Sequence, residues 1–122
     1  MRHHFGHRFE NGNVTFQTWA PKCKTLELET NRTESVFRAM ERDDDGWFVI
    51  SVDDVRHGDN YRFRIDGEKL RPDPAAHAFE ESVHDWNVAV DHASFDWRAT
   101  NWKGIPKRDL IVYELHLSLI HI

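Results

Sequence analysis

The feature that most restricts the fold of this chain is a succession of short runs in which apolar and polar residues alternate, with turn residues between them about every ten positions. Alternation with a period of two places successive side chains on opposite faces of a strand, and helical periodicity is nearly absent. Short strands at this spacing are typical of a β-sandwich. We therefore predict an all-β sandwich domain over residues 1–70.

Six runs are expected to form the strands of this sandwich. They are residues 5–10, 13–19, 25–29, 36–40, 47–52 and 61–65. Asn11-Gly12, between the first two runs, favours the positive φ angles of a two-residue hairpin turn. The fourth and fifth runs are predicted to pair across the solvated turn at 43–46. Arg62 and Arg64 alternate with apolar residues and are expected to form a solvated outward face with salt bridges of little energetic value.

The alternation of apolar and polar residues ends after residue 70. Arg71-Pro72-Asp73-Pro74 restricts the backbone too tightly for a central strand, so residues 71–107 are predicted to be an irregular linker with one short strand at 88–90. The apolar run that follows is typical of a strand buried on both faces of a parallel sheet. Residues 108–116 are therefore expected to begin a second domain.

Charge and composition exclude several classes of function. The net charge of −5 argues against nucleic-acid binding, which needs a positive face. No run is long and apolar enough for a membrane span or a secretory signal, and the single cysteine fits a reducing compartment, so we expect a cytoplasmic protein without membrane contact. We expect no metal site, because Asp43 to Asp45 form a turn, and His3, His4 and His7 lie at a frayed terminus.

The order of several motifs carries a resemblance to a known family. The segments are residues 14–21 with Trp19-Ala20-Pro21, 40–48, 58–67, 71–75, 90–97, 102–104 and 109–116. Together they resemble the N-terminal early-set, immunoglobulin-like domain of glycoside hydrolase family 13, a group that includes carbohydrate-binding module family 48. The malto-oligosyltrehalose trehalohydrolases are the most similar subgroup. Branching and debranching enzymes share some of these motifs and remain an alternative, as does a stand-alone glucan-binding module.

The resemblance implies a set of structural residues and a function. The matching signature residues are Trp19, Pro21, Tyr61, Pro72, Asp73, Pro74, Tyr113, Glu114 and His116. Residues 108–116 would be the first strand of a (β/α)8 barrel that is missing here, with His116 supporting a pocket. The family's catalytic carboxylates lie on later strands, so the chain would hold no catalytic residue and no cofactor. The parent enzyme would hydrolyse the α-1,4 bond that releases trehalose from maltooligosyltrehalose, and the partners of this domain would be that α-glucan and its own barrel.

Tryptophan is the residue type that best fits a sugar contact, because its indole offers a flat apolar face and an N–H donor. The candidates are Trp47, Trp86, Trp97 and Trp102; the last three are alternatively expected to pack the linker against the barrel. Trp19 and Phe16 lie on opposite faces of one strand, so at least one must pack outside the sandwich. Residues 117–122 depart from the family and match one reading frame of a sequencing-transposon end, so we expect an adapter-derived tail.

Overall fold

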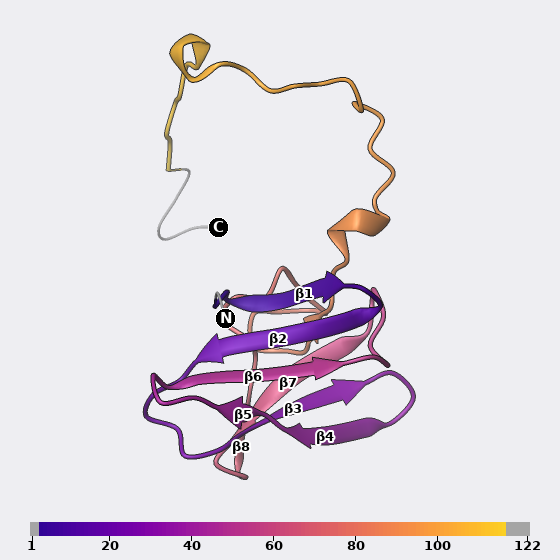
Figure 1. Ribbon diagram of the computed structural model, residues 1–122, viewed down its shortest axis with the longest axis vertical. Coiled ribbons are helices and arrows are strands. Elements are labelled where there is room, and N and C mark those ends of the chain that lie inside the picture. The colour runs from indigo at the N-terminus through magenta and orange to yellow at the C-terminus, as the bar shows by residue number, and fades with distance from the viewer. Residues whose placement is uncertain (1–2, 117–122) are drawn as a thin grey trace.

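Within residues 3–116, which the computed structural model describes, ten strands form two antiparallel sheets that pack face to face (Figure 1). The first sheet contains, in spatial order, β1 (Gly6–Glu10), β2 (Asn13–Trp19), β6 (Trp47–Val52) and β5 (Glu41–Arg42). The second contains β4 (Ser35–Ala39), β3 (Leu26–Asn31), β7 (Asn60–Ile65), β10 (Asn87–Val88) and β9 (Ala78–Phe79), with β8 (Lys69–Arg71) also paired to β7. The predicted all-β sandwich is confirmed.

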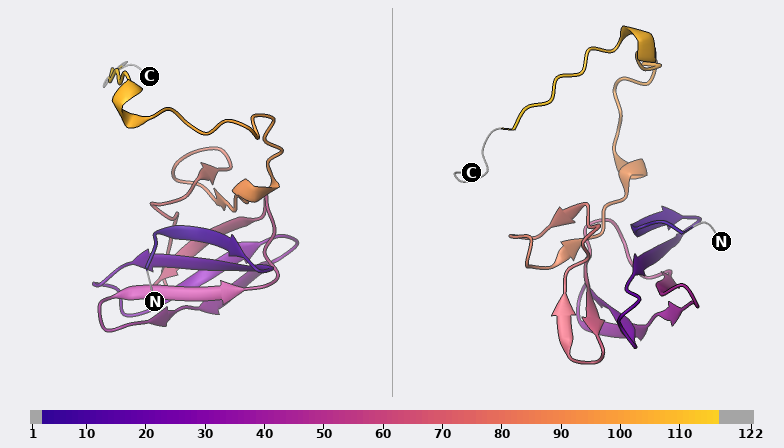
Figure 2. Two further views of the ribbon diagram at one scale, coloured as in Figure 1. Left: turned by 45° about the horizontal axis from the view of Figure 1, so that its top comes forward. Right: turned by 90° about the vertical axis from the view of Figure 1, so that its left-hand side faces the viewer.

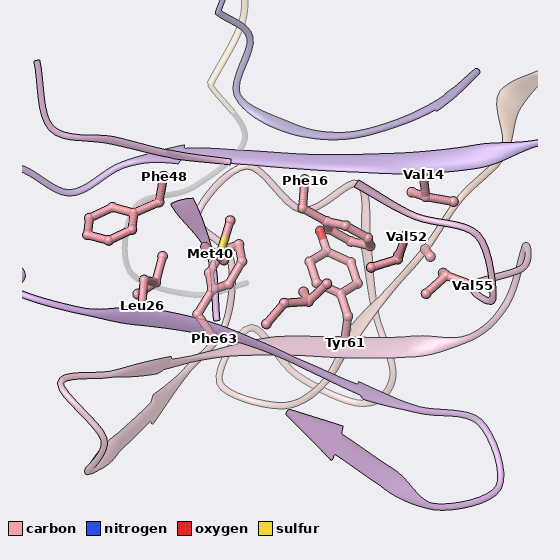
Figure 3. Packing of buried hydrophobic residues seen from close by; sticks show 11 residues of the cluster. Val14, Phe16, Leu26, Met40, Phe48, Val52, Val55, Tyr61 and Phe63 are labelled. Atoms are coloured by element: carbon pink, nitrogen blue, oxygen red, sulfur yellow. The ribbon is translucent and has the colours of Figure 1, made fainter. Parts of the chain in front are cut away.

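The core lies between the two sheets and is built from the inward residues of the alternating runs (Figure 3). Phe16 and Phe48 point inward from the first sheet and Tyr61 from the second, and Leu28 of β3 belongs to the same buried cluster. Each of these four side chains is at most 1% exposed. Burying a large apolar side chain contributes about 1.5–3 kcal/mol, which is why the period of two is so marked in these strands.

Two turns follow the sequence prediction. Asn11 and Gly12, at φ of 52° and 82°, connect β1 to β2 as the expected hairpin turn. Asp43 opens the turn before β6, and its Oδ1 accepts hydrogen bonds from the backbone N–H of Asp45 at 3.0 Å and of Trp47 at 2.9 Å. The carboxylate therefore satisfies backbone donors, as turn aspartates commonly do.

The predicted pairing between residues 36–40 and 47–52 is wrong. β4 pairs with β3 in the second sheet, and only the two-residue β5 pairs with β6 across the turn. Met40, 7% exposed, lies between β4 and β5 and fills the core while the chain crosses from one sheet to the other. Alternation specifies which side of a strand is buried, but it does not specify the neighbouring strand.

The second sheet continues beyond the boundary expected at residue 70. β9 and β10 pair with each other, and β10 pairs with β7. Asp73, Asn87 and Ala89 are fully buried. The segment up to residue 90 is therefore part of the sandwich, and its short strand is Asn87–Val88 instead of 88–90. Strands of two residues are too short to produce a periodic signal.

After the sandwich the chain runs out in an extended path (Figure 2) with two short 3₁₀ helices, η1 (His92–Ser94) and η2 (Lys107–Asp109). Residues 110–115 are mostly apolar and all exposed, with Ile111 at 98%. They pair with no strand in the described part of the chain, so the barrel strand at 108–116 stays a prediction. The expected tail at 117–122 lies outside the described residues.

Candidate functional site

The outward face of the second sheet carries two arginines that are held in place. Arg62 Nε lies 2.6 Å from Glu29 Oε2, and Arg64 donates from Nε and Nη2 to the two oxygens of Glu27 at 2.6 and 2.7 Å. The Glu29 side chain is only 4% exposed. The neighbouring Arg64 guanidinium lowers the pKa of Glu27. The predicted outward face with salt bridges is present, and its two arginine side chains are 26% and 30% exposed, so the face is partly covered.

Aromatic rings cover both guanidinium groups of this face. The Arg62 Cζ atom lies 3.7 Å from the ring centroid of Trp86, and the Arg64 Cζ atom lies 3.9 Å from that of Phe37. Arginine stacks well on aromatic faces, and such contacts contribute about 0.5–1 kcal/mol at exposed sites. We call Phe37, Arg62, Arg64 and Trp86, with Glu27 and Glu29, the arginine–aromatic face.

The arginine–aromatic face has the chemistry of a site for a hydroxyl-rich ligand. Trp86 is half-buried, so part of its indole remains accessible beside the Arg62 guanidinium. An apolar ring next to fixed hydrogen-bond donors and acceptors suits the alternating C–H and O–H groups of a sugar. Sequence reasoning identified Trp86 but missed Arg62 and Phe37. Arginines alternating with Tyr61 and Phe63 in β7 were the available signal.

Trp47 lies on the other sheet, where its ring already has aromatic neighbours. His3 stacks on it with ring centroids 4.6 Å apart and planes 4° apart, and Phe5 lies 4.8 Å from it. Trp19 is the ladder partner of Trp47 and is 53% exposed, with its Nε1–H donating to the Asp45 carbonyl at 3.0 Å. Because Phe16 is fully buried, the prediction that these two residues of β2 lie on opposite faces is confirmed.

The glycine before Trp47 fits tightly against the signature proline. Gly46 has a φ of +85°, and a Cβ at this position would lie 2.7 Å from Pro21 Cα. Ala20 N–H donates to the Gly46 carbonyl at 3.0 Å. The Trp19-Ala20-Pro21 motif therefore shapes the turn that leads into β6.

The four candidate tryptophans do not converge on one site. Trp86 belongs to the arginine–aromatic face and Trp47 to the opposite sheet, while Trp97 and Trp102 follow the sandwich and are 65% and 71% exposed. Trp97 meets Phe95 edge to face at 4.7 Å. Which of these residues contact sugar stays a prediction.

Two signature residues meet in a buried polar network between the sheets. Tyr61 Oη donates to Asp73 Oδ2 at 3.0 Å, and Asp73 Oδ1 accepts from Ala75 N–H at 2.9 Å. Asp73 N–H donates to Asn87 Oδ1 at 2.6 Å. Burial raises the pKa of Asp73, and burial together with the Asp73 carboxyl raises the pKa of Tyr61. Pro72 and Pro74 flank the aspartate and set its entry into the core.

His7 extends this network, although sequence reasoning placed it at a frayed terminus. It lies in β1, is 5% exposed, and its Nδ1 is 3.2 Å from Tyr61 Oη. The Tyr61 hydroxyl donates its proton to Asp73. The hydrogen bond between His7 and Tyr61 is therefore donated by the Nδ1–H of His7. The signal that could have revealed it is its place two residues before Phe9, in the inward phase of the strand.

The signature residues of the expected barrel strand stand apart from this network. Tyr113 is 82% exposed, and Glu114 and His116 are also exposed. In residues 3–116 no cluster of three or more histidine, cysteine, aspartate or glutamate residues is arranged to hold a metal ion. The same part of the chain contains no helix with the length and apolarity needed to cross a membrane.

Comparison with known proteins identifies relatives of this module. The family model for carbohydrate-binding module 48 (isoamylase N-terminal domain) matches residues 4–91. Malto-oligosyltrehalose trehalohydrolase of Saccharolobus solfataricus is 37% identical over 115 residues, which cover 93% of this chain and 20% of that protein. The 1,4-alpha-glucan branching enzyme GlgB of Pseudoalteromonas atlantica is 27% identical over 115 residues, covering 84% of this chain and 16% of that protein.

Solved structures share the same fold. A Salmonella typhimurium protein described as an alpha amylase superposes with a TM-score of 0.74 and 30% identity, over 84% of this chain and 17% of that one. Pullulanase from Anoxybacillus sp. LM18-11 gives a TM-score of 0.67 with 22% identity, over 77% of this chain and 14% of that one. The chain thus spans about a fifth or less of the length of these relatives.

Proposed function

The chain belongs to the carbohydrate-binding module 48 family, and from this premise we propose that it is the non-catalytic N-terminal domain of a glycoside hydrolase family 13 enzyme of the trehalohydrolase type. The parent enzyme would hydrolyse the α-1,4 bond that releases trehalose from maltooligosyltrehalose. Its two reacting carboxyl groups would lie on barrel strands outside this chain. A cytoplasmic location and a role in trehalose biosynthesis are part of the same proposal.

The observation that supports this proposal most strongly is the level of sequence identity, which is 37% with the Saccharolobus solfataricus trehalohydrolase and 27% with GlgB of Pseudoalteromonas atlantica. The family model ends at residue 91, whereas the alignment with the Saccharolobus solfataricus trehalohydrolase covers 93% of the chain. The similarity therefore includes most of the segment that follows the sandwich. Branching enzymes are also similar beyond the sandwich, so the higher identity, and not the length of the alignment, favours the trehalohydrolase type.

A barrel as intramolecular partner accounts for the exposed apolar residues after the sandwich. Ile111, Val112 and Tyr113 are each more than 80% exposed in this chain. Long apolar stretches are rarely left in water, and residues 108–116 have the composition of a strand covered on both faces. In the parent enzyme they would form the first barrel strand, and Trp97 and Trp102 would pack between the domains.

Trehalose release by the full-length enzyme is the first test. We expect the protein encoded by the intact gene to release trehalose from maltooligosyltrehalose, measured by chromatography of the products. Formation of new α-1,6 branch points from amylose without trehalose release would contradict the proposal and favour a branching enzyme, to which the 27% identity with GlgB also points. An intact gene that encodes no barrel would leave a stand-alone glucan-binding module.

The arginine–aromatic face is the place where we propose that this domain contacts the α-glucan. Trp86→Ala is expected to weaken binding of maltoheptaose by about two- to tenfold, because an aromatic contact contributes about 0.5–1.5 kcal/mol. Isothermal titration calorimetry measures the affinity without relying on tryptophan fluorescence. Trp47→Ala, on the other sheet, is the matched control and should leave the affinity unchanged. A loss with Trp47→Ala alone would move the contact to the first sheet, and no binding at millimolar ligand would leave a structural role.

A further inference from the structure

Residues 90–92 mark the place where the chain leaves the sandwich. β10 ends at Val88, Ala89 is buried, and η1 begins at His92. From here to residue 116, the last residue that the structure describes, the chain runs outward without joining either sheet (Figures 1 and 2). We call residues 90–92 the exit strap, because its contacts decide how the following segment is tethered to the domain.

Histidines from three separate segments hold the three consecutive residues of the exit strap. Val90 N–H donates to Nε2 of His7 at 2.8 Å, Asp91 N–H donates to Nδ1 of His57 at 3.0 Å, and Nε2 of His92 lies 2.9 Å from Nδ1 of His77. His7 comes from β1, His57 from the turn before β7, and His77 from the loop before β9. Histidine side chains thus contact the strap at every one of its positions.

Each of these contacts requires an unprotonated imidazole nitrogen. His7 and His57 accept hydrogen bonds from backbone N–H groups, and a protonated ring has two donors and no acceptor. Protonation would therefore turn each attraction into a contact between two donors. In the pair formed by His77 and His92 one ring must accept, so the pair does not survive when both rings are protonated.

We propose that the exit strap is an acid-sensitive tether, closed on the sandwich while its histidines are neutral and released when they are protonated, with the two sheets remaining folded. Histidine is the side chain whose charge ordinarily changes between about pH 5 and 8, so the release falls in a range that cells and compartments reach. Several titrating contacts on adjacent residues make the opening steeper than one contact would.

Other charged and titratable groups face the strap histidines. Glu10 and Arg56 line a hollow together with His57 and Asp91, and the Asp73 carboxyl interacts electrostatically with His77. His4, which precedes β1, and Arg8 of β1 line a hollow of about 320 Å³ together with His7, His77 and His92, and Arg8 adds positive charge there. The Tyr61 hydroxyl donates a hydrogen bond to the Asp73 carboxyl. The Asp91 carboxylate accepts from Ala93 N–H at 3.0 Å at the start of η1. In the described part of the chain, the ion pairs within 4.0 Å include none of the four strap histidines.

The contact between the buried His7 and Val90 is expected to break at a lower pH than an unperturbed histidine would allow. Burial lowers the pKa of His7 below 6.5, and the charges of His77 and His92 act in the same direction, against the backbone contact with Val90, which raises it. The Val90 carbonyl, 3.1 Å from Nε2, would accept from a protonated ring, so His7 keeps one hydrogen bond to Val90 after the bond from Val90 N–H is lost. His57, His77 and His92 are exposed, so their rings are in direct contact with solvent.

Acid lowers the folding stability that His7 contributes, because burial lowers the pKa of its side chain. The unfolded chain takes up the His7 proton at a higher pH than the folded chain. The contribution of His7 to folding stability is therefore fully present above pH 6.5 and is lost as the pH falls toward its folded value.

Residue-resolved amide hydrogen exchange of the 122-residue chain, corrected for the intrinsic pH dependence of exchange, tests the tether. Between about pH 7.5 and about pH 5, we expect the protection of Asp91 to fall about fivefold, with Val90 following at the lower pH, because each N–H loses its histidine acceptor. Ala89 is the internal control, since its N–H donates to the Asp59 carbonyl at 2.9 Å and no histidine takes part. Unchanged protection of Asp91, or equal losses at Ala89 and in β2, would overturn the proposal.

A substitution separates titration from general acid effects. In His57→Asn the amide Oδ1 can take the position of Nδ1 and accept from Asp91 N–H at every pH, so Asp91 should keep its protection at about pH 5. His84→Asn, at an exposed histidine outside the strap, is the matched control and should lose protection at Asp91 like the unchanged chain. The same acid loss in both variants would show that His57 does not control this contact.

Discussion

Replacing Gly46 with alanine is expected to lower the free energy of unfolding by about 3 kcal/mol, as measured by urea denaturation of the 122-residue chain. Two effects add at this position. The φ of +85° is costly for any residue with a Cβ, and the new Cβ would lie 2.7 Å from Pro21 Cα and 2.8 Å from Pro21 Cβ. Because a proline backbone is stiff, the turn before β6 must move to make room.

Gly58→Ala is the matched control for this prediction. Gly58 has a φ of +91°, and a Cβ added there would meet no other atom of the described residues within 4 Å. The control should therefore lose only the conformational part, about 1 kcal/mol. If the two variants lost the same free energy, the contact between Gly46 and Pro21 would have no energetic role, and the glycine would be needed for its backbone angles alone.

Asp73→Ala is expected to have an effect of similar size, about 3 kcal/mol. The substitution removes the acceptor of the Tyr61 hydroxyl and of Ala75 N–H, and each buried donor left without a partner costs about 1–3 kcal/mol. Tyr61→Phe removes only the hydroxyl and should cost less. A double-mutant cycle of Asp73→Ala and Tyr61→Phe should show that the losses are not additive, because both act on one hydrogen bond.

The exposed turn residue Asp44 provides the control, and pH adds a second check. Asp44→Ala should change the free energy of unfolding by less than about 0.5 kcal/mol. Because burial raises the pKa of Asp73 above 3.8, the folded chain keeps this proton to a higher pH than the unfolded chain. The resulting stabilisation is complete below pH 3.8 and is lost as the pH rises through the folded value. The loss caused by Asp73→Ala should accordingly shrink as the pH rises over this range.

Sequence reasoning predicted the strands well where alternation is long. The runs at 13–19 and 47–52 coincide with β2 and β6, and the hairpin at Asn11-Gly12 forms as expected. The partner of β4 was not predictable, because both sheets offer a strand whose apolar face matches it. β9 and β10 were missed because two residues carry no period.

The candidate site was predictable in its residue types and not in its geometry. Trp86 stood out as an aromatic residue in an irregular segment, but it reaches Arg62 only because the adjoining β10 pairs with β7. The pairing of Tyr61 with Asp73 and the burial of His7 also depend on tertiary contacts. Local patterns report which side of an element is buried, and they do not report which buried polar groups find each other.

The contact between His7 and Val90 has a consequence for how the domain is made. It joins residues 83 positions apart, so β1 lacks this partner until almost the whole sandwich has been synthesised. At about 5–20 residues per second, several seconds pass between the synthesis of His7 in β1 and the synthesis of Val90. Nascent chains stopped before residue 87 should therefore remain incomplete at this end, and synthesis of the last short strand is the step that closes the domain.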